Sequence, residues 1–313
     1  MPYKVLVTPR SFGRHSNEPY EILNQFGVEV KMNPYGKILT EEQMIEEIKD
    51  VDGIIVGVDP LNKKVLQHAE NLKVISKYGV GIDNIDMEYA KEKNIEVVRA
   101  MNANADAVAD YTLALMMAVA RNVVQIDKEC RELNWQKITT VDVHKKTLGL
   151  IGLGNIGKKV VQRAKGFEMD ILAYDLVPDE EYAEKSGIQY VNKLEEIFEK
   201  ADFITLHLPL NEHTEHIVGR EQLERMKSTA VLVNTARGGL IDEQALSDAL
   251  QERLIWGAGI DVFESEPPQN KELLELDNIV IGSHCAASTV QAIDNMGIIS
   301  SQNLVDLFKQ SDK

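Results

Sequence analysis

The stretch that decides the fold reads Leu148-Gly-Leu-Ile-Gly152-Leu-Gly154-Asn155-Ile156-Gly157. The apolar run 147–153 predicts a strand, and the run 158–166 predicts a helix directly after it. The glycines between them follow the pattern G-x-G-x-x-G. Gly152 permits a tight turn, Gly154 lets a ligand approach the backbone, and Gly157 lets the helix pack closely on the strand. We therefore expect a strand–turn–helix unit with a diphosphate at the positive helix N-terminus.

A second strand, 170–174, ends at Asp175, which is 18 residues after Gly157 (175 − 157). An acidic residue about 20 residues after the glycines accepts hydrogen bonds from the ribose hydroxyls of a dinucleotide. The same carboxylate repels the additional phosphate of NADP. Leu176 follows Asp175, and no Arg or Lys stands beside it to bind that phosphate. The sequence therefore predicts NAD as the cofactor.

Strand and helix patterns alternate along the rest of the chain. Before the glycine motif, strands are expected at 4–8, 28–32, 53–58 and 72–77, and helices at 18–26, 41–48 and 63–68. Thr40 is expected to cap the helix 41–48. After the motif, further strands are expected at 203–208, 230–234, 257–261 and 278–282, and a final helix at 289–310. This alternation predicts two α/β units with parallel sheets.

The charge of the chain excludes several classes of partner. A formal net charge of −16 and a pI of about 4.9 disfavour nucleic acid and anionic membranes, which require clustered Lys and Arg. Two cysteines and no evident signal peptide favour a cytoplasmic protein with reduced thiols. No metal site and no membrane span are expected. The longest apolar segment, 107–120, is too short to cross a bilayer.

The segment 104–121 is the most strongly helical part of the sequence, because Ala, Leu and Met fill it without Gly or Pro. Its apolar residues cover more than one stripe of the helix. A helix that is apolar all round must be buried on all sides. We therefore expect this helix to form a subunit interface.

Three polar segments follow late strands, where an open α/β sheet binds its ligands. They contain Arg237, Glu266 and His284. Oxidation of a secondary alcohol by hydride loss needs a base for the hydroxyl proton, and His284 serves that role near neutral pH. Glu266 is the candidate carboxylate that orients the imidazole and favours its protonated form. Arg237 offers a planar set of donors to a substrate carboxylate and a developing carbonyl.

Together these residues resemble the D-2-hydroxyacid dehydrogenase family, most closely its phosphoglycerate dehydrogenases in the short form that lacks a regulatory domain. The similarity runs from about residue 5 to about residue 305. It includes Lys77-Tyr-Gly-Val-Gly-Ile-Asp-Asn-Ile-Asp, similar to the substrate loop of the family, and Asn104-Ala-Asp-Ala-Val-Ala-Asp at the start of the long helix. The resemblance implies reversible hydride transfer between C2 of a small 2-hydroxy acid and NAD.

The resemblance also implies an architecture of two doubly wound domains. An NAD-binding Rossmann domain, 101–284, would be inserted into a flavodoxin-like substrate domain formed by 1–100 and 285–313, with both ligands in the cleft between them. A homodimer would form through the helix 104–121 and the loop around Trp135. The implied substrate-binding residues are Lys77, Tyr78, Gly79, Val80, Gly81 and Arg237. The implied cofactor-binding residues are Val80, Val108, Gly152, Gly154, Asn155, Ile156, Gly157, Asp175, Leu208, Pro209, Thr235, Ala236, Asp261 and Ala286.

The sequence departs from the family pattern where phosphoglycerate enzymes carry an Arg that faces the substrate phosphate. Val58 or Asp59 stands there, and Asp59 is expected to repel a phosphate, although Lys77 offers a point charge. We therefore expect weak turnover of phosphoglycerate. Further departures are Arg99-Ala-Met-Asn at the hinge, Asp110 at the start of the long helix and Cys285 beside the histidine. For the hinge, altered domain closure and an Arg99 that lines the substrate side are both open, and Asp110 has no assigned role. For Cys285, a small buried residue and a redox-sensitive thiol are both open.

Two other functions remain open from the sequence. Within the same chemistry, the chain is compatible with a hydroxypyruvate or glyoxylate reductase, or with a dehydrogenase of another anionic hydroxy acid. In another class, some relatives are NADH-sensing binding proteins without turnover. The intact set of Arg, Glu and His favours an enzyme.

Overall fold

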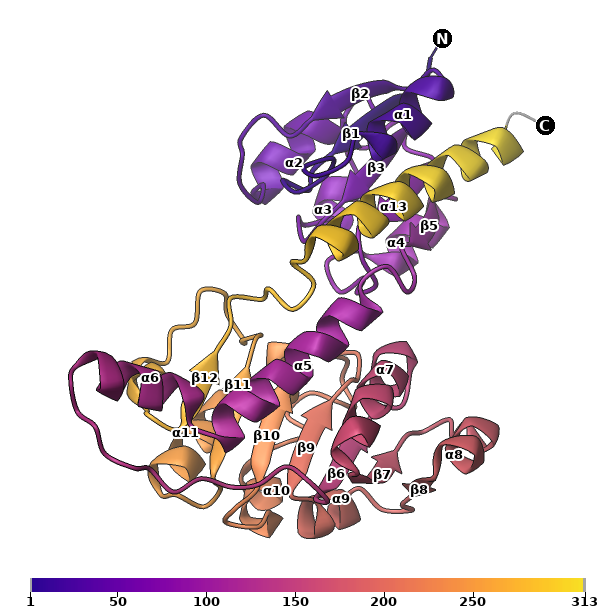
Figure 1. Cartoon of the computed structure of the whole chain (residues 1–313). Coiled ribbons are helices and arrows are strands. Elements are labelled where there is room, and N and C mark those ends of the chain that lie inside the picture. Colours follow the sequence, from indigo (N-terminus) through magenta and orange to yellow (C-terminus); the bar gives the residue numbers. More distant parts are fainter. Residues whose placement is uncertain (1, 312–313) are drawn as a thin grey trace. The chain divides into compact units, whose positions relative to one another are not determined.

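The computed structural model describes residues 2–311 and divides into two compact units. Unit 1 is Met1–Asn104 with Ala287–Lys313, and unit 2 is Ala105–Ala286 (Figure 1). The chain thus passes between the units at 104–105 and 286–287, whereas the resemblance implied 100–101 and 284–285. Each unit has one parallel sheet with helices packed on it, so the predicted α/β fold class is confirmed.

The sheet of unit 1 has the strand order β2-β1-β3-β4-β5. Its strands are β1 (Lys4–Val7), β2 (Glu29–Met32), β3 (Gly53–Val56), β4 (Val74–Lys77) and β5 (Glu96–Arg99). Its helices are α1 (Glu18–Gln25), α2 (Glu41–Ile48), α3 (Lys63–Leu66), α4 (Met87–Glu92) and α13 (Val290–Ser311). Thr40 caps α2 as predicted, because its hydroxyl accepts from the backbone N–H of Gln43 while the Gln43 side chain accepts from Thr40. The central strands β3 and β4 are buried along their whole length, as expected for a sheet covered on both faces.

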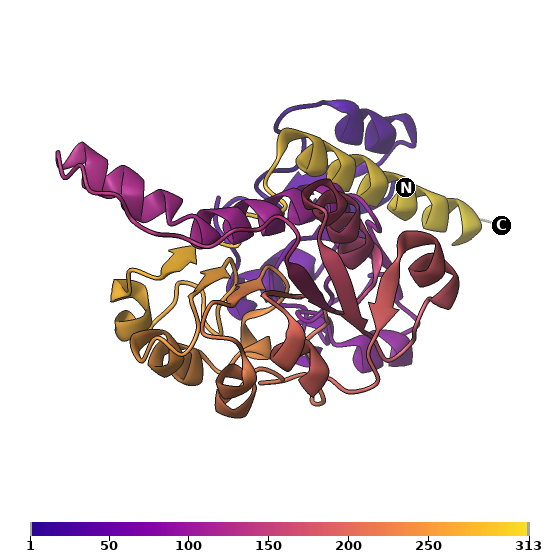
Figure 2. The ribbon, with the colours of Figure 1, turned by 60° about the horizontal axis from the view of Figure 1, so that its bottom comes forward.

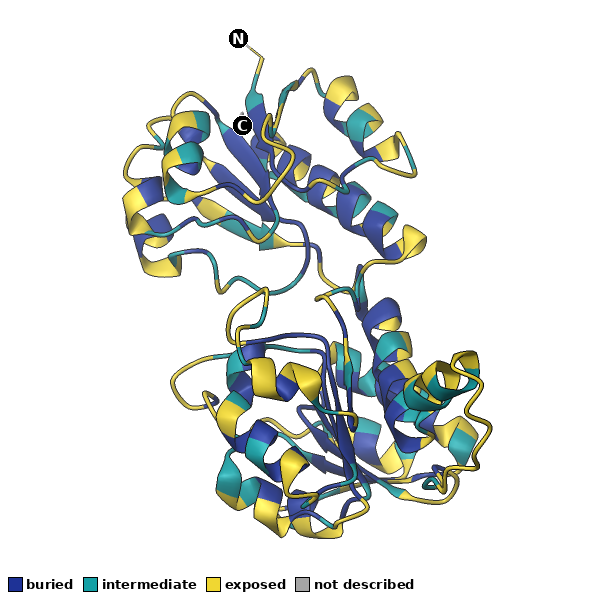
Figure 3. Cartoon of the chain, turned by 90° about the vertical axis from the view of Figure 1, so that its left-hand side faces the viewer, coloured by how far each residue is buried: buried dark blue, intermediate teal, exposed yellow. Residues whose placement is uncertain are grey.

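The last helix, α13, completes unit 1 although it is far from the other elements in sequence. It packs against α1 and β4, and its Phe308 stacks on Tyr3 with ring centroids 4.0 Å apart. A Cβ on Gly53 would lie 2.8 Å from the Phe308 ring, so glycine in β3 lets the helix approach the sheet. The C-terminal segment is therefore part of the core of unit 1 (Figure 3).

The sheet of unit 2 has the strand order β12-β11-β10-β9-β6-β7-β8 (Figure 2). Its strands are β6 (Thr147–Ile151), β7 (Asp170–Tyr174), β8 (Ile188–Tyr190), β9 (Phe203–Leu206), β10 (Val231–Asn234), β11 (Gly257–Ile260) and β12 (Ile279–Ile281). Its helices are α5 (Ala105–Ala120), α6 (Val123–Arg131), α7 (Asn155–Ala164), α8 (Glu180–Ser186), α9 (Glu195–Lys200), α10 (Arg220–Arg225), α11 (Glu243–Gln251) and α12 (Lys271–Glu275), with 3₁₀ turns η1 (Lys165–Phe167) and η2 (Gly238–Leu240). The order reverses at β6, so β6 and β9 flank the switch point where such sheets bind ligands.

Three elements of unit 2 differ from the sequence prediction. The helix after the glycine motif begins at Asn155, not at Lys158, so Gly157 lies inside it. A Cβ on Gly157 would lie 2.5 Å from the carbonyl oxygen of Gly152, so close packing, rather than helix propensity, selects glycine there. The strand β8 and the helix α6 were not predicted, because their short or charged sequences carry little periodic signal.

The long helix α5 is largely buried inside unit 2 itself. It packs against α7, β10 and β11, and ten of its residues are buried there. Its all-round apolar character therefore does not by itself require a partner subunit, contrary to the reasoning from sequence. The exposed apolar side chains instead follow it, on α6 and the loop behind it. Among residues 2–311, no single helix is long and apolar enough to cross a bilayer, although α5 and α6 together reach that length and composition across a bend of 59°.

Candidate active site

The glycine-rich turn between β6 and α7 has the geometry of a dinucleotide cradle. Gly152 has a φ of 97°, and a Cβ on it would lie 2.5 Å from the carbonyl oxygen of His207. A Cβ on Gly154 would meet no atom within 4 Å, so the backbone there is open to a ligand. Gly154 is also the N-cap of α7 and has no side chain to bind the first N–H groups of the helix. Asn155 and Ile156 contribute those N–H groups, which fit a diphosphate.

Asp175 follows β7 beside this turn. Its Oδ2 accepts a hydrogen bond of 2.7 Å from the backbone N–H of Leu153, and its Oδ1 accepts one of 2.9 Å from Val177. The carboxylate therefore holds the glycine-rich turn in place, and its remaining lone pairs suit ribose hydroxyls. Leu176 and Val177 after it are exposed. These residues fit NAD rather than NADP.

The long helix reaches the same edge of the sheet. The Thr112 hydroxyl donates to the carbonyl oxygen of Val108 and lies 2.8 Å from the Thr235 hydroxyl, so α5 is joined to the loop after β10. Leu208 and Pro209 follow β9 at that edge. His207 precedes them, and its burial lowers the pKa of the imidazole to about 3, so this histidine stays neutral at physiological pH.

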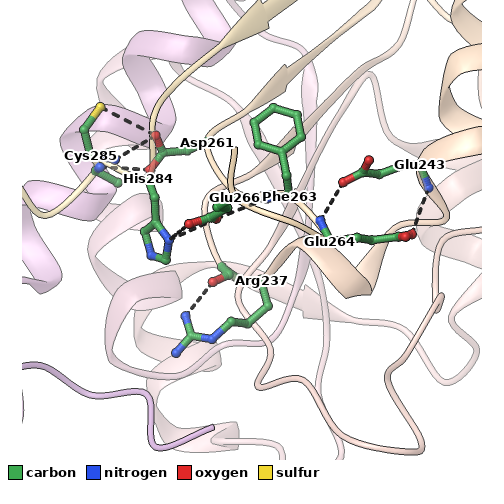
Figure 4. A network of polar contacts seen from close by, with 10 residues as sticks. Arg237, Glu243, Asp261, Phe263, Glu264, Glu266, His284 and Cys285 are labelled. Atoms are coloured by element: carbon green, nitrogen blue, oxygen red, sulfur yellow. Dashed lines mark hydrogen bonds and ion pairs between the residues drawn. The ribbon is translucent and has the colours of Figure 1, made fainter. Parts of the chain in front are cut away.

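His284 and Glu266 form a close pair. The imidazole Nδ1 of His284 lies 2.8 Å from Oε2 of Glu266 and 3.0 Å from Oε1 (Figure 4). With Nδ1–H bound to the carboxylate, Nε2 is the nitrogen left for a substrate. His284 has a left-handed backbone with a φ of 54°, and its N–H donates to the carbonyl oxygen of Asp261 at 2.7 Å. The backbone of Asp261 thus helps to hold this unusual conformation.

Asp261 is fully buried, and its carboxylate binds the residues that follow the histidine. Oδ1 accepts from the N–H of Cys285 at 3.0 Å, and Oδ2 accepts from that of Ala286 at 2.8 Å. The Cys285 thiol lies 3.3 Å from the hydroxyl of Tyr111 and 3.6 Å from Oδ1 of Asp261. Burial and these neighbours raise the pKa of Tyr111. Cys285 is therefore a partly buried thiol in a hydrogen-bonded cluster.

Arg237 lies on the loop after β10, next to the loop that carries Glu266. The turn is held by the buried Asn234, whose Nδ2 donates to the carbonyl oxygen of Arg237 at 2.8 Å and whose Oδ1 accepts from the N–H of Ala236 at 3.0 Å. A guanidinium N–H of Arg237 donates to the carbonyl oxygen of Ala236 at 2.6 Å. A Cβ on Gly238 would lie 1.9 Å from the carbonyl carbon of Phe263, so the two loops are in backbone contact. Arg237, Glu266 and His284 thus come together from loops after the neighbouring strands β10, β11 and β12 (Figure 4).

The predicted substrate loop lies in unit 1, after β4. Gly79 has a φ of 127°, which favours glycine, and Val80 and Gly81 follow it, partly buried. The Lys77 ammonium is buried and donates to the carbonyl oxygen of Gly57 and to Asn84 Oδ1. The Tyr78 hydroxyl donates to the carbonyl oxygen of Ile293 at 2.9 Å, and burial raises the pKa of Tyr78 to about 12. Both side chains therefore contribute contacts within unit 1.

Asp59, which was expected to repel a phosphate, makes structural contacts within unit 1. Asp59 is buried, and its carboxylate accepts from the Thr8 hydroxyl at 2.5 Å and from the N–H of Leu39 at 2.9 Å. It joins two loops of unit 1 and does not point into solvent. Its neighbour Val58 is the exposed residue at this position.

The departure at Asp110 is a structural contact of the side chain, whereas the contact at Arg99 is made by the backbone and does not depend on the side chain. Asp110 on α5 forms an ion pair with Arg163 on α7, which also binds Asp106. The carbonyl oxygen of Arg99, at the end of β5, accepts from Asn303 of α13 at 3.1 Å. Asp110 therefore joins two helices of unit 2, and the Arg99 backbone joins a strand to a helix of unit 1.

Sequence reasoning missed the residues that support the site. They are Tyr111, Asn234, Gly238, Glu243 and Glu264. The glycine pair after Arg237 was a usable signal for a close backbone approach. Contacts between side chains distant in sequence carried no such signal.

Comparison with known proteins identifies the family. The family model for "D-isomer specific 2-hydroxyacid dehydrogenase, NAD binding domain" matches residues 113–286. The chain is 46% identical over 269 residues to a D-3-phosphoglycerate dehydrogenase of Methanocaldococcus jannaschii, covering 85% of this chain and 51% of that protein. It is 41% identical over 281 residues to a glyoxylate reductase of Korarchaeum cryptofilum, covering 87% and 84%. The chain thus spans about half the length of the first relative and most of the second.

A solved structure gives the same assignment. D-lactate dehydrogenase of Aquifex aeolicus, complexed with NAD and lactic acid, superimposes with a TM-score of 0.85 at 29% identity, over 98% of this chain and 96% of that chain. The resemblance inferred from sequence is therefore confirmed by the family model, the curated relatives and the fold. This chain belongs to the D-isomer specific 2-hydroxyacid dehydrogenase family, and unit 2 contains its NAD-binding domain.

Proposed function

We propose that this chain is an NAD-dependent dehydrogenase that interconverts a small D-2-hydroxy acid and the corresponding 2-oxo acid. One observation carries this proposal: the hydrogen-bonded pair of His284 and Glu266 lies beside Arg237, on loops at the edge of the sheet that holds the glycine-rich turn. Bound NAD supplies the hydride acceptor in the oxidation direction. The activity of the relatives named above supports the same reaction class.

The chemistry of the chain follows from the orientation of the imidazole. During oxidation, Nε2 of His284 takes the proton of the C2 hydroxyl, and the carboxylate of Glu266 stabilises the imidazolium that forms. During reduction, the same imidazolium returns the proton to the carbonyl oxygen. Arg237 binds the carboxylate or the carbonyl oxygen of the substrate through its planar donors. The backbone N–H groups around Gly79–Gly81 bind the substrate carboxylate.

We further propose that the substrate lacks a phosphate group. The Lys77 ammonium is buried among Gly57 and Asn84, and the exposed residue after β3 is the apolar Val58. Neither offers a cation to a phosphate at this position. A glyoxylate- or hydroxypyruvate-sized acid therefore fits better than phosphoglycerate.

A panel of 2-oxo and 2-hydroxy acids, monitored by NADH absorbance, tests the proposal. We expect turnover of small 2-oxo acids, with a kcat/KM for 3-phosphoglycerate at least about tenfold below that for the best acid. The variant His284→Ala should lose hydride transfer and still bind NADH, as measured by fluorescence titration. Full activity of His284→Ala would contradict the proposed mechanism. Wild-type NADH binding without turnover of any acid would favour the NADH-sensing alternative.

We also propose a cytoplasmic homodimer. Leu133 and Trp135, in the loop after α6, are 88% and 82% exposed, and Val123 and Val124 on α6 are also exposed. Apolar side chains of this size gathered in one segment are typical of an interface. Sedimentation of the wild type should show a dimer, and Leu133→Ser combined with Trp135→Ser should shift it toward monomer. A monomeric wild type at micromolar concentration would contradict the proposal.

A further inference from the structure

The loop that carries Glu266 has a second acidic residue that points the other way. Glu266 is directed toward His284, whereas the Glu264 side chain is directed toward Glu243, the first residue of α11 (Figure 4). The two glutamates are separated by a single residue in the chain. A contact that fixes Glu264 therefore also restricts Glu266.

Glu243 and Glu264 form a reciprocal pair of hydrogen bonds. The backbone N–H of Glu264 donates to Oε1 of Glu243 at 2.5 Å, and the backbone N–H of Glu243 donates to Oε1 of Glu264 at 3.3 Å. Nε2 of His216 lies 3.1 Å from the same Oε1 of Glu264. The backbone N–H of His216 donates to the carbonyl oxygen of Gly239, so the histidine is also hydrogen-bonded to the loop that carries Arg237.

The position of Glu243 is not needed to cap its helix. Asp242 already accepts hydrogen bonds of 3.0 Å from the N–H groups of Gln244 and Ala245. Burial and the neighbouring Glu264 carboxylate raise the pKa of Glu243, although the hydrogen bond from Glu264 opposes this. Placing a partly buried carboxylate beside a second carboxylate is unfavourable for folding, and the helix does not need Glu243 as a cap. The contact between Glu243 and the loop of Glu264 therefore accounts for a carboxylate at this position.

The same loop segment is confined from a second direction. The backbone of Gly238 lies against Phe263 and Glu264, since a Cβ there would approach the Glu264 nitrogen to 2.5 Å. The Phe263 side chain is buried in the core of unit 2. The backbone N–H of Phe263 donates to Oε1 of Glu266 at 3.2 Å. Phe263 and Glu264 therefore have little freedom, and this rigidity extends to the Glu266 carboxylate.

We propose that Glu243 is a positioning residue of the dehydrogenase: by holding the peptide N–H of Glu264, its carboxylate fixes Glu266 against His284. This inference rests on the proposed function only for the roles of Glu266 and His284. Glu243 touches neither substrate nor cofactor and acts through the loop. If the Glu266 carboxylate is misplaced, it stabilises the His284 imidazolium less. Loss of Glu243 should therefore lower kcat, which depends on proton transfer, more than it changes the substrate KM.

Four variants test this role. Glu243→Ala removes the acceptor, and Glu243→Gln keeps an oxygen that accepts from Glu264. Glu180→Ala is the matched control, because Glu180 is also the first residue of a helix and follows the N-cap Asp179, but lies exposed on α8. Glu266→Gln is combined with Glu243→Ala to measure the coupling between the two positions.

We expect Glu243→Ala to lower kcat about tenfold, with the substrate KM changed by less than about twofold, as for the loss of one charge-assisted hydrogen bond. Its pH–rate profile for reduction should fall at lower pH than that of the wild type. Glu243→Gln and Glu180→Ala should stay within about twofold of the wild type. In the Glu266→Gln background, Glu243→Ala should have almost no further effect, because it acts through Glu266.

Two results would overturn the inference. One is a Glu243→Ala enzyme with the kcat and pH profile of Glu180→Ala. The other is a double variant whose losses multiply, which indicates an effect on stability independent of Glu266. If Glu243→Ala does not fold, Glu243→Asp replaces it, since the shorter side chain withdraws the same carboxylate, and a wild-type kcat then overturns the inference. Full activity of His284→Ala contradicts the proposed function instead, so the two failures are distinguishable.

Discussion

The Oε2 atom of Glu266 lies 2.8 Å from Nδ1 of His284, although the two residues are 18 positions apart and follow different strands. Both side chains are partly exposed, at 39% for Glu266 and 42% for His284. An ion pair this exposed contributes little to folding. Its geometry instead assigns the tautomer of the imidazole and leaves Nε2 available to a substrate.

Replacing Glu266 by Gln should change the pH dependence of 2-oxo acid reduction. In the proposed mechanism, reduction requires the imidazolium, and a neutral carboxamide cannot compensate this positive charge as a carboxylate does. The high-pH fall in kcat/KM should therefore move to lower pH, and kcat at pH 8 should drop at least about tenfold. A pH series of initial rates with NADH measures both effects. An unchanged profile would show that the carboxylate has no influence on the proton donor.

Gly238→Ala should destabilise unit 2 strongly. The added Cβ would lie 1.9 Å from the carbonyl carbon of Phe263, and backbone atoms cannot move aside as a flexible side chain does. We expect a loss of at least about 2 kcal/mol in the free energy of unfolding, measured by urea denaturation. Gly166→Ala is the control, because a Cβ there meets nothing within 4 Å. Equal stability of the two variants would contradict the close approach.

Asp175→Ala should weaken the binding of NADH and reduce the preference of the enzyme for NADH over NADPH. The variant lacks the carboxylate that we propose as an acceptor for the ribose hydroxyls, and it also loses the hydrogen bond that holds the N–H of Leu153. We expect the Kd for NADH to rise about tenfold, with a smaller change for NADPH, in fluorescence titrations. Asp170→Ala, at the opposite end of β7, should leave both values unchanged. A constant ratio of the two affinities would exclude Asp175 from cofactor selection.

Tyr78 should make the stability of unit 1 depend on alkaline pH. Its pKa is raised from about 10 to about 12 by burial, so the folded state keeps the proton that the unfolded state releases. The resulting stabilisation is complete below about pH 10 and is lost as the pH rises through about 12. Tm should therefore fall less steeply across this range in Tyr78→Phe than in the wild type, as measured by calorimetry. Parallel curves would contradict the assigned burial effect.

The sequence predicted the parts of the molecule that depend on local pattern. The glycine motif and the Thr40 cap each reflect a backbone requirement of one turn or one helix end. Most strands of both sheets were predicted, because buried parallel strands are short apolar runs. The strands β5 and β8 were missed. The positions of Arg237, Glu266 and His284 after late strands followed from the same alternation, because parallel strands end at one edge of a sheet.

Other contacts were decided only by tertiary structure. The burial of Asp59 and Lys77, and the pairing of Glu243 with Glu264, join residues that lie about 20 positions apart in the chain. Such contacts depend on which strands are neighbours and how each loop folds back, and neither leaves a periodic trace in the sequence. The sequence by itself thus determined the elements and the chemical groups at the ends of the strands. The packing of the loops decided which of those groups stay exposed and which are buried and hold other segments in place.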